Sequence, residues 1–389
     1  MLTTLAISGY RSLRDIVVPM SRLTLVTGAN GSGKSNLYRA LRLIAESAQG
    51  GVVAALAREG GLQSVLWGGP EQPTRAMREG RAPVEGTRRT SPVALRLGFA
   101  GEEFGYAIDL GLPTPGNAGP TLFAHDPEIK REAIWSGPFL RPANALVDRK
   151  GPLLRVREAR EWRVAGQHLD PFESLFTQAD AAAGAAEIAA LRESIRRWRF
   201  HDQFRADTDA PARHSQLGTR TPVMHHDGRD LAAAWQTIIE IGDAQALAEA
   251  VDDAFPGASV TVQGEAGRFT LLFTQRGLLR PLTAAELSDG TLRYLLWIAA
   301  LLAPRPSPLR VLNEPETSLH PDLLPALARL IRRAALEGQM WVVSHAPRLL
   351  AGLEEDAACT SLHLEKIGSE TRLAGQGLLD APAWHWPER

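Results

Sequence analysis

The feature that most constrains the fold of this chain is a glycine-rich stretch close to its start. An apolar run at 23–26 is followed by GANGSGKS at 28–35, after which Leu37, Leu41 and Ile44 recur at helical spacing. This pattern predicts a strand, a loop and a helix. Glycines in such a loop let successive backbone N–H groups turn toward a phosphate, and the positive end of the helix dipole points the same way.

The loop fits the pattern G-x-x-x-x-G-K-[ST], which predicts a nucleoside triphosphate site with Mg²⁺. Lys34 is expected to reach the β- and γ-phosphates, and the Ser35 hydroxyl to ligate the metal. Only four of the 43 basic residues are lysines, so an arginine-rich chain uses lysine where a compact point charge suits phosphate. The residues predicted to contact ATP in this loop are Gly28, Ala29, Asn30, Gly31, Ser32, Gly33, Lys34, Ser35 and Asn36.

Composition limits the classes of protein to consider. A chain of 389 residues can form two domains or one large domain with an insertion, and a net charge of −1 gives no overall signal for binding a polyanion. The longest apolar run, Leu295 to Ala303, is too short to cross a bilayer, and the N-terminus lacks the pattern of a signal peptide. The single cysteine, Cys359, is interpreted as a small buried hydrophobe rather than a reactive thiol. We therefore expect a soluble cytoplasmic protein that does not bind membranes.

Strand and helix signals alternate along the rest of the chain. Alternating apolar residues at 93–99 and 104–110 predict a β-hairpin. Helical spacing appears over 187–199, 231–241 and 244–254. Two apolar strands at 309–312 and 340–343 are separated by a predicted helix, which is typical of a parallel sheet with helical cover. We expect three segments: 1–120 and 251–389 as the halves of one α/β domain, and 121–250 as an inserted, mixed and partly helical lid.

Three further motifs follow the phosphate loop in a fixed order. Ser288, Asp289 and Gly290 precede a predicted helix, the strand at 309–312 runs into Asn313-Glu314-Pro315, and the next strand ends at Ser344-His345. In this order the motifs resemble the signature, Walker B and switch histidine of ATP-binding-cassette (ABC) ATPases. The resemblance implies an ABC-ATPase-type P-loop fold with ATP and Mg²⁺ as ligands.

The resemblance also implies a role for each motif. Glu314 would activate or orient the attacking water, His345 would contact that water and the γ-phosphate, and Asn313 would face the metal through its water. In this family, Ser288, Asp289 and Gly290 would contact the nucleotide that is held by the other protomer of an ATP-bound homodimer. Most members have Asp where this chain has Asn313, and the lost charge near the metal predicts slow hydrolysis.

The N-terminal sequence ISGYRSLRDIVVPMSRLTLVTGANGSGKSN resembles the RecF, SMC and OLD branch of these ATPases. Arg11, in the Tyr10-Arg11-Ser12 turn, is expected either near the nucleotide or on an exposed turn. No heptad region is present in the insertion, and only 44 residues follow His345, too few for the Toprim nuclease of OLD proteins. The resemblance is therefore to a compact, stand-alone RecF-like ATPase.

Several residues carry weaker predictions. Arg192, Arg196, Arg199 and Arg205, with Trp198 and Phe204 among them, are a candidate DNA contact, although a solvated arginine face on a packed helix explains the same pattern. Gln63 is a candidate Q-loop residue. His225-His226-Asp227 is interpreted as a polar loop rather than a metal site.

The function predicted is an ATPase that uses ATP-dependent dimerisation to act on DNA or a partner protein, in DNA repair, DNA maintenance or phage defence. The alternative is a nucleotide-gated regulatory module that controls a separately encoded effector and hydrolyses little ATP. A transporter subunit is the third and least favoured interpretation.

Overall fold

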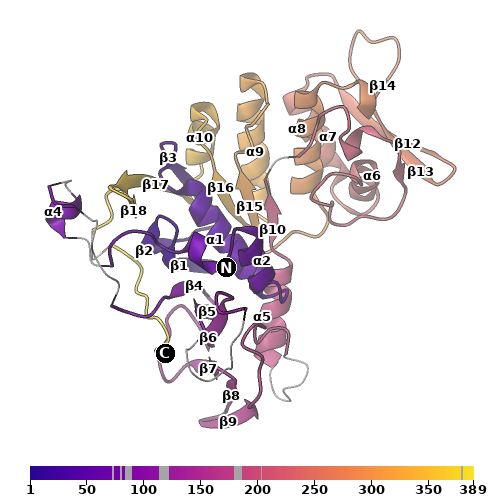
Figure 1. Cartoon of the computed structure of the whole chain (residues 1–389). Helices are drawn as coiled ribbons and strands as arrows, with labels where there is room; N and C mark the ends of the chain where they lie inside the picture. Colours follow the sequence, from indigo (N-terminus) through magenta and orange to yellow (C-terminus); the bar gives the residue numbers. More distant parts are fainter. Residues whose placement is uncertain are drawn as a thin grey trace. The chain divides into compact units, whose positions relative to one another are not determined.

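The computed structural model describes residues 1–71, 74–78, 81–83, 90–113, 122–178, 186–202, 204–377 and 380–389. These residues divide into two compact units (Figure 1). Unit 1 contains Met1–Ser21, Val26–Trp198 and Leu362–Arg389, and unit 2 contains Arg22–Leu25 and Arg199–Ser361. The predicted domain boundary at 120/121 lies outside the described residues. The three-segment division therefore stays a prediction.

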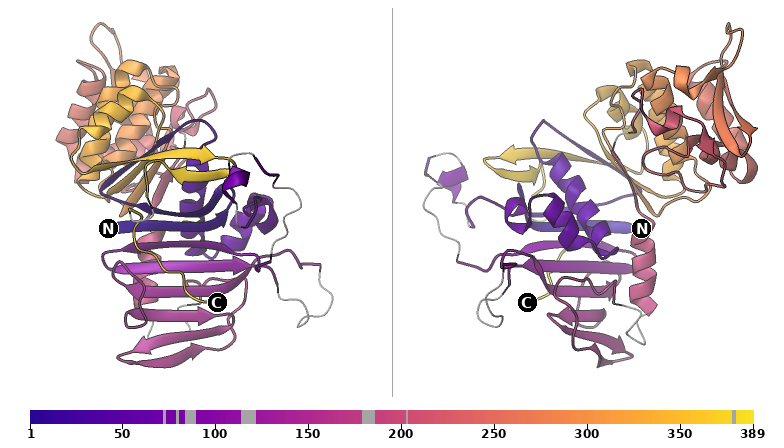
Figure 2. Two further views of the ribbon diagram at one scale, coloured as in Figure 1. Left: turned by 90° about the vertical axis from the view of Figure 1, so that its left-hand side faces the viewer. Right: turned by 45° about the vertical axis from the view of Figure 1, so that its right-hand side comes forward.

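Unit 1 is built on an eight-stranded antiparallel sheet (Figure 2). The predicted hairpin is confirmed as its β4–β5 pair, in which Leu97 lies opposite Ile108 and Phe99 opposite Tyr106. The strands of 128–166 continue the same sheet, so this part of the predicted insertion is β-structure. In spatial order the strands are β2 (Leu13–Pro19), β1 (Leu2–Tyr10), β4 (Leu95–Gly101), β5 (Phe104–Gly111), β6 (Glu128–Ser136), β7 (Ala145–Lys150), β8 (Leu153–Glu158) and β9 (Glu161–Gly166).

The middle of this sheet contains a buried ion pair. The side chains of Glu132 and Arg149 are fully buried, with Oε2 and Nη1 2.8 Å apart. Glu132 also accepts hydrogen bonds from the hydroxyls of Tyr106 and Ser174 and from the Leu175 N–H. Because a buried charge is tolerated only when its hydrogen-bonding capacity is met, this network fixes the loop at 174–175 against the sheet.

The helices of unit 1 begin with α1 (Lys34–Ser47), whose predicted inner face of Leu37, Leu41 and Ile44 is buried. Helix α1 packs on β1, β4 and α2. The predicted helix at 187–199 ends earlier than expected, at Arg196. The remaining helices are α2 (Val52–Arg58), α3 (Leu62–Val65), α4 (Arg75–Arg78) and α5 (Ala186–Arg196).

Unit 2 has a parallel core of β10 (Arg199–His201), β15 (Leu309–Asn313) and β16 (Gln339–Val343). Helix α8 (Asp289–Leu301) is buried from Tyr294 to Leu301, which explains the long apolar run in the sequence as a core helix. In the described part of the chain, no helix is long and apolar enough to span a bilayer. The other helices are α6 (Leu231–Ile241), α7 (Ala244–Ala254), α9 (Leu324–Ala335) and α10 (Pro347–Glu354).

A small antiparallel sheet accompanies these helices within unit 2. Its strands are β11 (Gln216–Leu217), β12 (Ser259–Glu265), β13 (Arg268–Thr274) and β14 (Leu282–Thr283). Strand β14 leads through a short 3₁₀ turn at Ala284–Glu286 to the start of α8.

Two strands have residues in both units. In β3 (Leu23–Gly28), the first three residues belong to unit 2 and the last three belong to unit 1. In the order of the sheet, β3 is the neighbour of β16. In β17 (Cys359–Ile367), the residues from Leu362 onward belong to unit 1 and pair with β18 (Glu370–Leu373). Burial raises the pKa of the Cys359 thiol to about 11, so this side chain is a neutral thiol near pH 7.

Candidate functional site

The phosphate loop lies between β3 and α1, as the sequence predicts. Gly28, Gly31 and Gly33 have φ of 143°, 77° and 109°, a region that side chains other than glycine rarely adopt. A Cβ on Gly28 would lie 2.3 Å from the Leu364 carbonyl oxygen, and one on Gly33 would lie 2.2 Å from Thr371 Oγ1. Nothing lies within 4 Å of the Cβ position of Gly31. Two of the three glycines are therefore required for space as well as for backbone conformation.

The phosphate loop is braced by a residue from the far end of the chain. Thr371 of β18 donates its hydroxyl to the Ser32 carbonyl oxygen over 2.8 Å and lies 2.6 Å from the Ser12 hydroxyl. Ser12 in turn accepts a hydrogen bond from the Asn36 amide over 2.8 Å. These contacts join the Tyr10-Arg11-Ser12 turn, the loop and α1. Ser12 and Thr371 were not among the predicted site residues. Ser12 was noted only as part of the Tyr10-Arg11-Ser12 turn, and nothing in the local sequence of Thr371 marks it.

Lys34 is buried, with 6% of its surface exposed. Its ammonium donates to the carbonyl oxygens of Gly28 at 2.7 Å and Ala29 at 3.1 Å. Among the residues that the structure describes, no carboxylate forms an ion pair with it. A buried cation that is bound only by carbonyls is electrostatically suited to receive an anion.

Arg11 lies on the same turn as Ser12, but its side chain contacts a different residue, Glu59. Its Nη2 donates to Glu59 Oε2 over 2.7 Å, and the Tyr10 hydroxyl donates to the same oxygen over 2.6 Å. Burial, followed by the nearby Glu59, raises the pKa of Tyr10. Arg11 has φ of 48° and is half-buried, so it is not simply an exposed turn residue. A direct contact of Arg11 with nucleotide stays a prediction.

In unit 2, the predicted Walker B residues lie at the carboxyl end of β15. Asn313 pairs with Val343 across the β15–β16 ladder. Glu314 follows with φ of 50°, and its N–H donates to the Val343 carbonyl oxygen over 2.8 Å. A non-glycine residue in this region costs on the order of 1–3 kcal/mol, which the surrounding contacts must offset. The strained backbone sets the direction in which the Glu314 carboxylate leaves the strand.

Glu316 positions the predicted switch histidine. Its buried carboxylate accepts the Ser344 hydroxyl over 2.8 Å and the His345 N–H over 3.0 Å, both through Oε1. His345 Nδ1 lies 3.4 Å from that oxygen and 3.9 Å from Glu314 Oε1. The structure thus brings Glu314 and His345 together and adds Glu316, which the sequence analysis did not select. The only sequence signal for Glu316 was its place two residues after Glu314.

Two side-chain oxygens at and just after the end of β15 lack a hydrogen-bond donor. Asn313 Oδ1 and Glu316 Oε2 are buried and have no hydrogen-bond partner. Oxygen ligands and hydrogen bonds to metal-bound water are what Mg²⁺ requires, so Asn313 fits the predicted role toward a metal. In the described part of the chain, no group of three or more His, Cys, Asp or Glu side chains is placed to bind a metal by itself.

The predicted signature residues lie at the start of α8. Ser288 is the N-cap, and its hydroxyl accepts the Thr291 N–H over 3.2 Å. A Cβ on Gly290 would lie 3.3 Å from the Ser318 carbonyl oxygen, so glycine permits close approach of the segment after Glu314. Arg293 donates to the Thr317 carbonyl oxygen over 3.0 Å. The signature helix and the segment after Glu314 are thus in contact within unit 2.

The candidate DNA contact is altered by the structure. Because α5 ends at Arg196 and Arg199 begins β10, Arg199 does not share a helical face with Arg192 and Arg196. Trp198 and Phe204 are buried, at 5% and 2% exposure, and pack on Phe99 and Trp297. Neither aromatic ring is available to stack on a base. This correction removes the aromatic part of the predicted DNA surface.

The two remaining candidates have local partners. Gln63 Nε2 lies 3.0 Å from His125 Nδ1. His225 Nδ1 lies 2.7 Å from Asp227 Oδ1 and its ring packs on His226. A Q-loop role for Gln63 stays a prediction.

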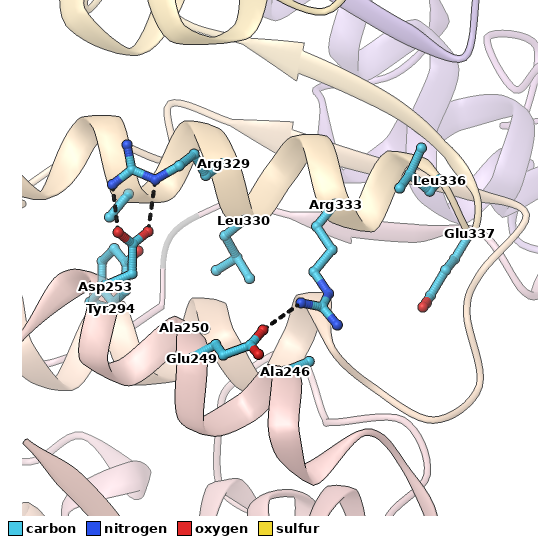
Figure 3. Close-up of a pocket in the computed structure, with 11 residues that line it drawn as sticks. Ala246, Glu249, Ala250, Asp253, Tyr294, Arg329, Leu330, Arg333, Leu336 and Glu337 are labelled. Carbon is cyan, nitrogen blue, oxygen red and sulfur yellow. Dashed lines mark hydrogen bonds and ion pairs between the residues drawn. The ribbon is translucent and has the colours of Figure 1, made fainter.

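A cavity of about 670 Å³ lies between α7, α8 and α9 (Figure 3). Its two arginines are paired: Arg329 with Asp253 at 2.7 Å, and Arg333 with Glu249 at 3.2 Å and Asp243 at 2.8 Å. The cations of this cavity are therefore neutralised, and it lacks the electrostatics of the phosphate loop.

Comparison with known proteins places these motifs in a family. Residues 23–351 match the family described as "AAA domain, putative AbiEii toxin, Type IV TA system". No curated protein matches the chain in sequence.

Solved structures with the same fold include SMC heads. An SMC head bound to the C-terminal winged-helix domain of ScpA is 13% identical, with a TM-score of 0.52 over 98% of this chain and 99% of that one. An SMC head with an extended coiled coil from Pyrococcus furiosus, bound to the C-terminal domain of ScpA, is also 13% identical, with a TM-score of 0.50 over 98% and 97%. At this identity the likeness shows the fold, which confirms the predicted fold class.

Proposed function

We propose that this chain, which belongs to the AAA domain family matched over residues 23–351, binds and hydrolyses ATP. We also propose that it changes between monomer and dimer as it does so. The observation that carries the proposal is Lys34, whose buried ammonium has, among the residues that the structure describes, only the loop's own carbonyl oxygens as partners. Triphosphate binding exchanges those carbonyls for anionic oxygens, which are stronger acceptors for a cation. The glycine conformations around it leave backbone N–H groups to complete the phosphate cradle.

Hydrolysis is proposed to depend on Glu314 and His345. The Glu314 carboxylate orients the attacking water and accepts its proton, and His345 stabilises the γ-phosphate and the same water. Mg²⁺, when bound, neutralises the phosphate charge, with Ser35 and Asn313 as the residues proposed to contact it or its water. Asn313 lacks the charge of an aspartate, so we propose slow turnover. That the phosphate loop and these residues serve one nucleotide is itself part of the proposal and is supported by the order of the motifs.

In the proposed cycle, two protomers close over two ATP molecules. The γ-phosphate bound by one protomer is contacted by Ser288, Asp289 and Gly290 of the other. Hydrolysis then separates the two protomers. The position of these residues at the start of α8 supports this part, because Ser288 caps the Thr291 N–H and the amides of Asp289 and Gly290 lie in the first turn, where an anion can bind. The dimer is proposed to act on DNA or on a partner protein, in DNA maintenance or phage defence.

A regulatory module with little hydrolysis is the second candidate, and Asn313 favours it. The family description names a toxin of a toxin–antitoxin system, which accords with a nucleotide-gated module that works with a separate partner.

The test is ATP turnover by the wild type and Glu314→Gln, with and without DNA, with oligomer size measured in the same samples. The ATPase proposal expects turnover that falls by at least about a hundredfold in Glu314→Gln, while ATP binding is retained and a dimer accumulates. A wild type that binds ATP and dimerises without hydrolysis would favour the regulatory module. A wild type that fails to bind ATP would overturn both.

A further inference from the structure

Next to the signature residues of unit 2 lies a buried arginine that the sequence analysis did not select. Arg213 is in a short 3₁₀ turn, Pro211–Arg213, and its side chain is 8% exposed. Its Nη1 donates to the carbonyl oxygens of Ala284, Ala285 and Leu287 over 3.2, 3.1 and 2.7 Å. Its Nε and Nη2 also donate to the carbonyl oxygens at 206 and 207. One guanidinium therefore fixes the whole segment that leads into Ser288.

The same guanidinium neutralises the carboxylate inside the signature. Arg213 Nη2 lies 2.6 Å from Asp289 Oδ1, while the Asp289 side chain is 61% exposed. Asp289 is the first residue of α8, flanked by Ser288 and Gly290, which are proposed to contact a γ-phosphate. An unpaired carboxylate there would repel the phosphate and compete for the positive end of the helix.

We propose that Arg213 is a positioning residue for the signature: it pairs with Asp289 and fixes the 284–287 segment, so that the N-terminus of α8 presents a neutral, correctly oriented surface to the γ-phosphate of the partner protomer. The inference rests on the proposed ATP-dependent dimer. It assigns two separable tasks to one side chain, since backbone carbonyls need its donors and Asp289 needs its charge.

The two tasks separate in a set of variants made in the Glu314→Gln background. Arg213→Gln removes the charge and most donors, and Asp289→Asn removes the carboxylate. Arg213→Lys keeps the charge but not the planar fork of donors. Arg220→Gln is the matched control, because Arg220 follows Arg213 closely in the sequence, is 67% exposed and forms a surface ion pair with Glu240 at 3.6 Å.

Sedimentation would give the dimer dissociation constant at saturating ATP, and fluorescence titration would give ATP affinity of the monomer. Arg213→Gln is expected to weaken dimerisation by at least about tenfold, the scale of an uncompensated buried or charged partner, and to leave monomer ATP binding unchanged. Adding Asp289→Asn to Arg213→Gln should recover part of the loss, and Arg213→Lys should lie between the wild type and Arg213→Gln. Arg220→Gln should match its parent.

Two outcomes would overturn the inference by itself. A dimer that forms equally well in Arg213→Gln removes the positioning role, and an Arg213→Gln defect that Asp289→Asn leaves unchanged removes the charge-neutralising role, leaving a purely structural arginine. If the parent binds ATP but forms no dimer, the proposed function fails at its dimer step and this inference fails with it. Measuring dimerisation of the Glu314→Gln parent thus distinguishes failure of the proposed function from failure of this inference alone.

Discussion

The phosphate loop in unit 1 and the strand ends in unit 2 achieve their geometry by different means. The loop is defined by backbone conformation, with three glycines at positive φ and a lysine bonded to the loop's own carbonyls. The Glu314 and His345 region is defined by side chains, because the buried Glu316 carboxylate holds the Ser344 hydroxyl and the His345 N–H. A backbone motif is written in consecutive residues, whereas a side-chain scaffold depends on residues brought together by folding.

The comparison predicts that the loop is most sensitive where a side chain has no space. Gly33→Ala is expected to reduce ATP affinity by about a hundredfold or more, because its Cβ meets both an unfavourable φ and Thr371 Oγ1. Gly31→Ala is the matched control: it has positive φ but open space, and the backbone cost of about 1–2 kcal/mol predicts a loss nearer tenfold.

Fluorescent-nucleotide titration measures both variants, and circular dichroism checks that each is folded. Equal losses in the two variants would show that φ alone, and not contact with Thr371, limits the loop.

The region around Glu314 and His345 is expected to lose activity when a hydrogen-bond acceptor is removed, rather than when a side chain is enlarged. Glu316→Ala leaves the Ser344 hydroxyl and the His345 N–H without their partner, at about 1–3 kcal/mol for each buried group. We expect ATP turnover to fall about tenfold or more while ATP affinity changes little. Glu316→Gln keeps an acceptor oxygen at the same place and should retain most of the turnover.

Steady-state turnover of the single variants and of Glu316→Ala combined with His345→Ala tests this explanation. Because both changes disable the same histidine, their effects should be far from additive. Additive losses would mean that Glu316 acts independently of His345.

The smallest effect concerns acid stability of the strand core in unit 2. Burial, followed by Arg310, lowers the pKa of His201 to about 3 from 6.5. Below pH 6.5 the unfolded chain binds a proton that the folded chain does not, so stability is complete above pH 6.5 and is lost toward pH 3. The slope from this group is about 1.4 kcal/mol per pH unit at most.

Urea unfolding at pH 7, 6 and 5 measures this slope for the wild type and His201→Phe, which keeps an aromatic ring beside Phe204 and Trp297. The variant should have the shallower pH dependence. His385→Phe, at an exposed position of unit 1, is the control. An unchanged slope in His201→Phe would show that other groups determine the acid response.

The sequence alone was enough to predict the phosphate loop, the strand end at Asn313 and Glu314, the helix start at Ser288 and the strand end at His345, together with the fold class that their order indicates. Each is a short run of residues whose backbone preferences and apolar periodicity are local. Local reasoning was wrong at 187–199, where helical spacing continued past Arg196 although the chain turns into β10. There, parallel pairing with β15 decides the structure, and Trp198 and Phe204 are buried by contacts that periodicity does not report.

Only the tertiary structure decided which residues orient these motifs. Thr371 bonds the Ser32 carbonyl across 339 positions, Arg213 bonds Asp289 across 76, and Glu316 bonds the His345 N–H across 29. Such partners have ordinary local sequences, because a hydrogen bond depends on distance and direction in space and not on spacing along the chain. The motifs therefore indicate the chemistry proposed for this chain, and the tertiary contacts orient the residues of those motifs.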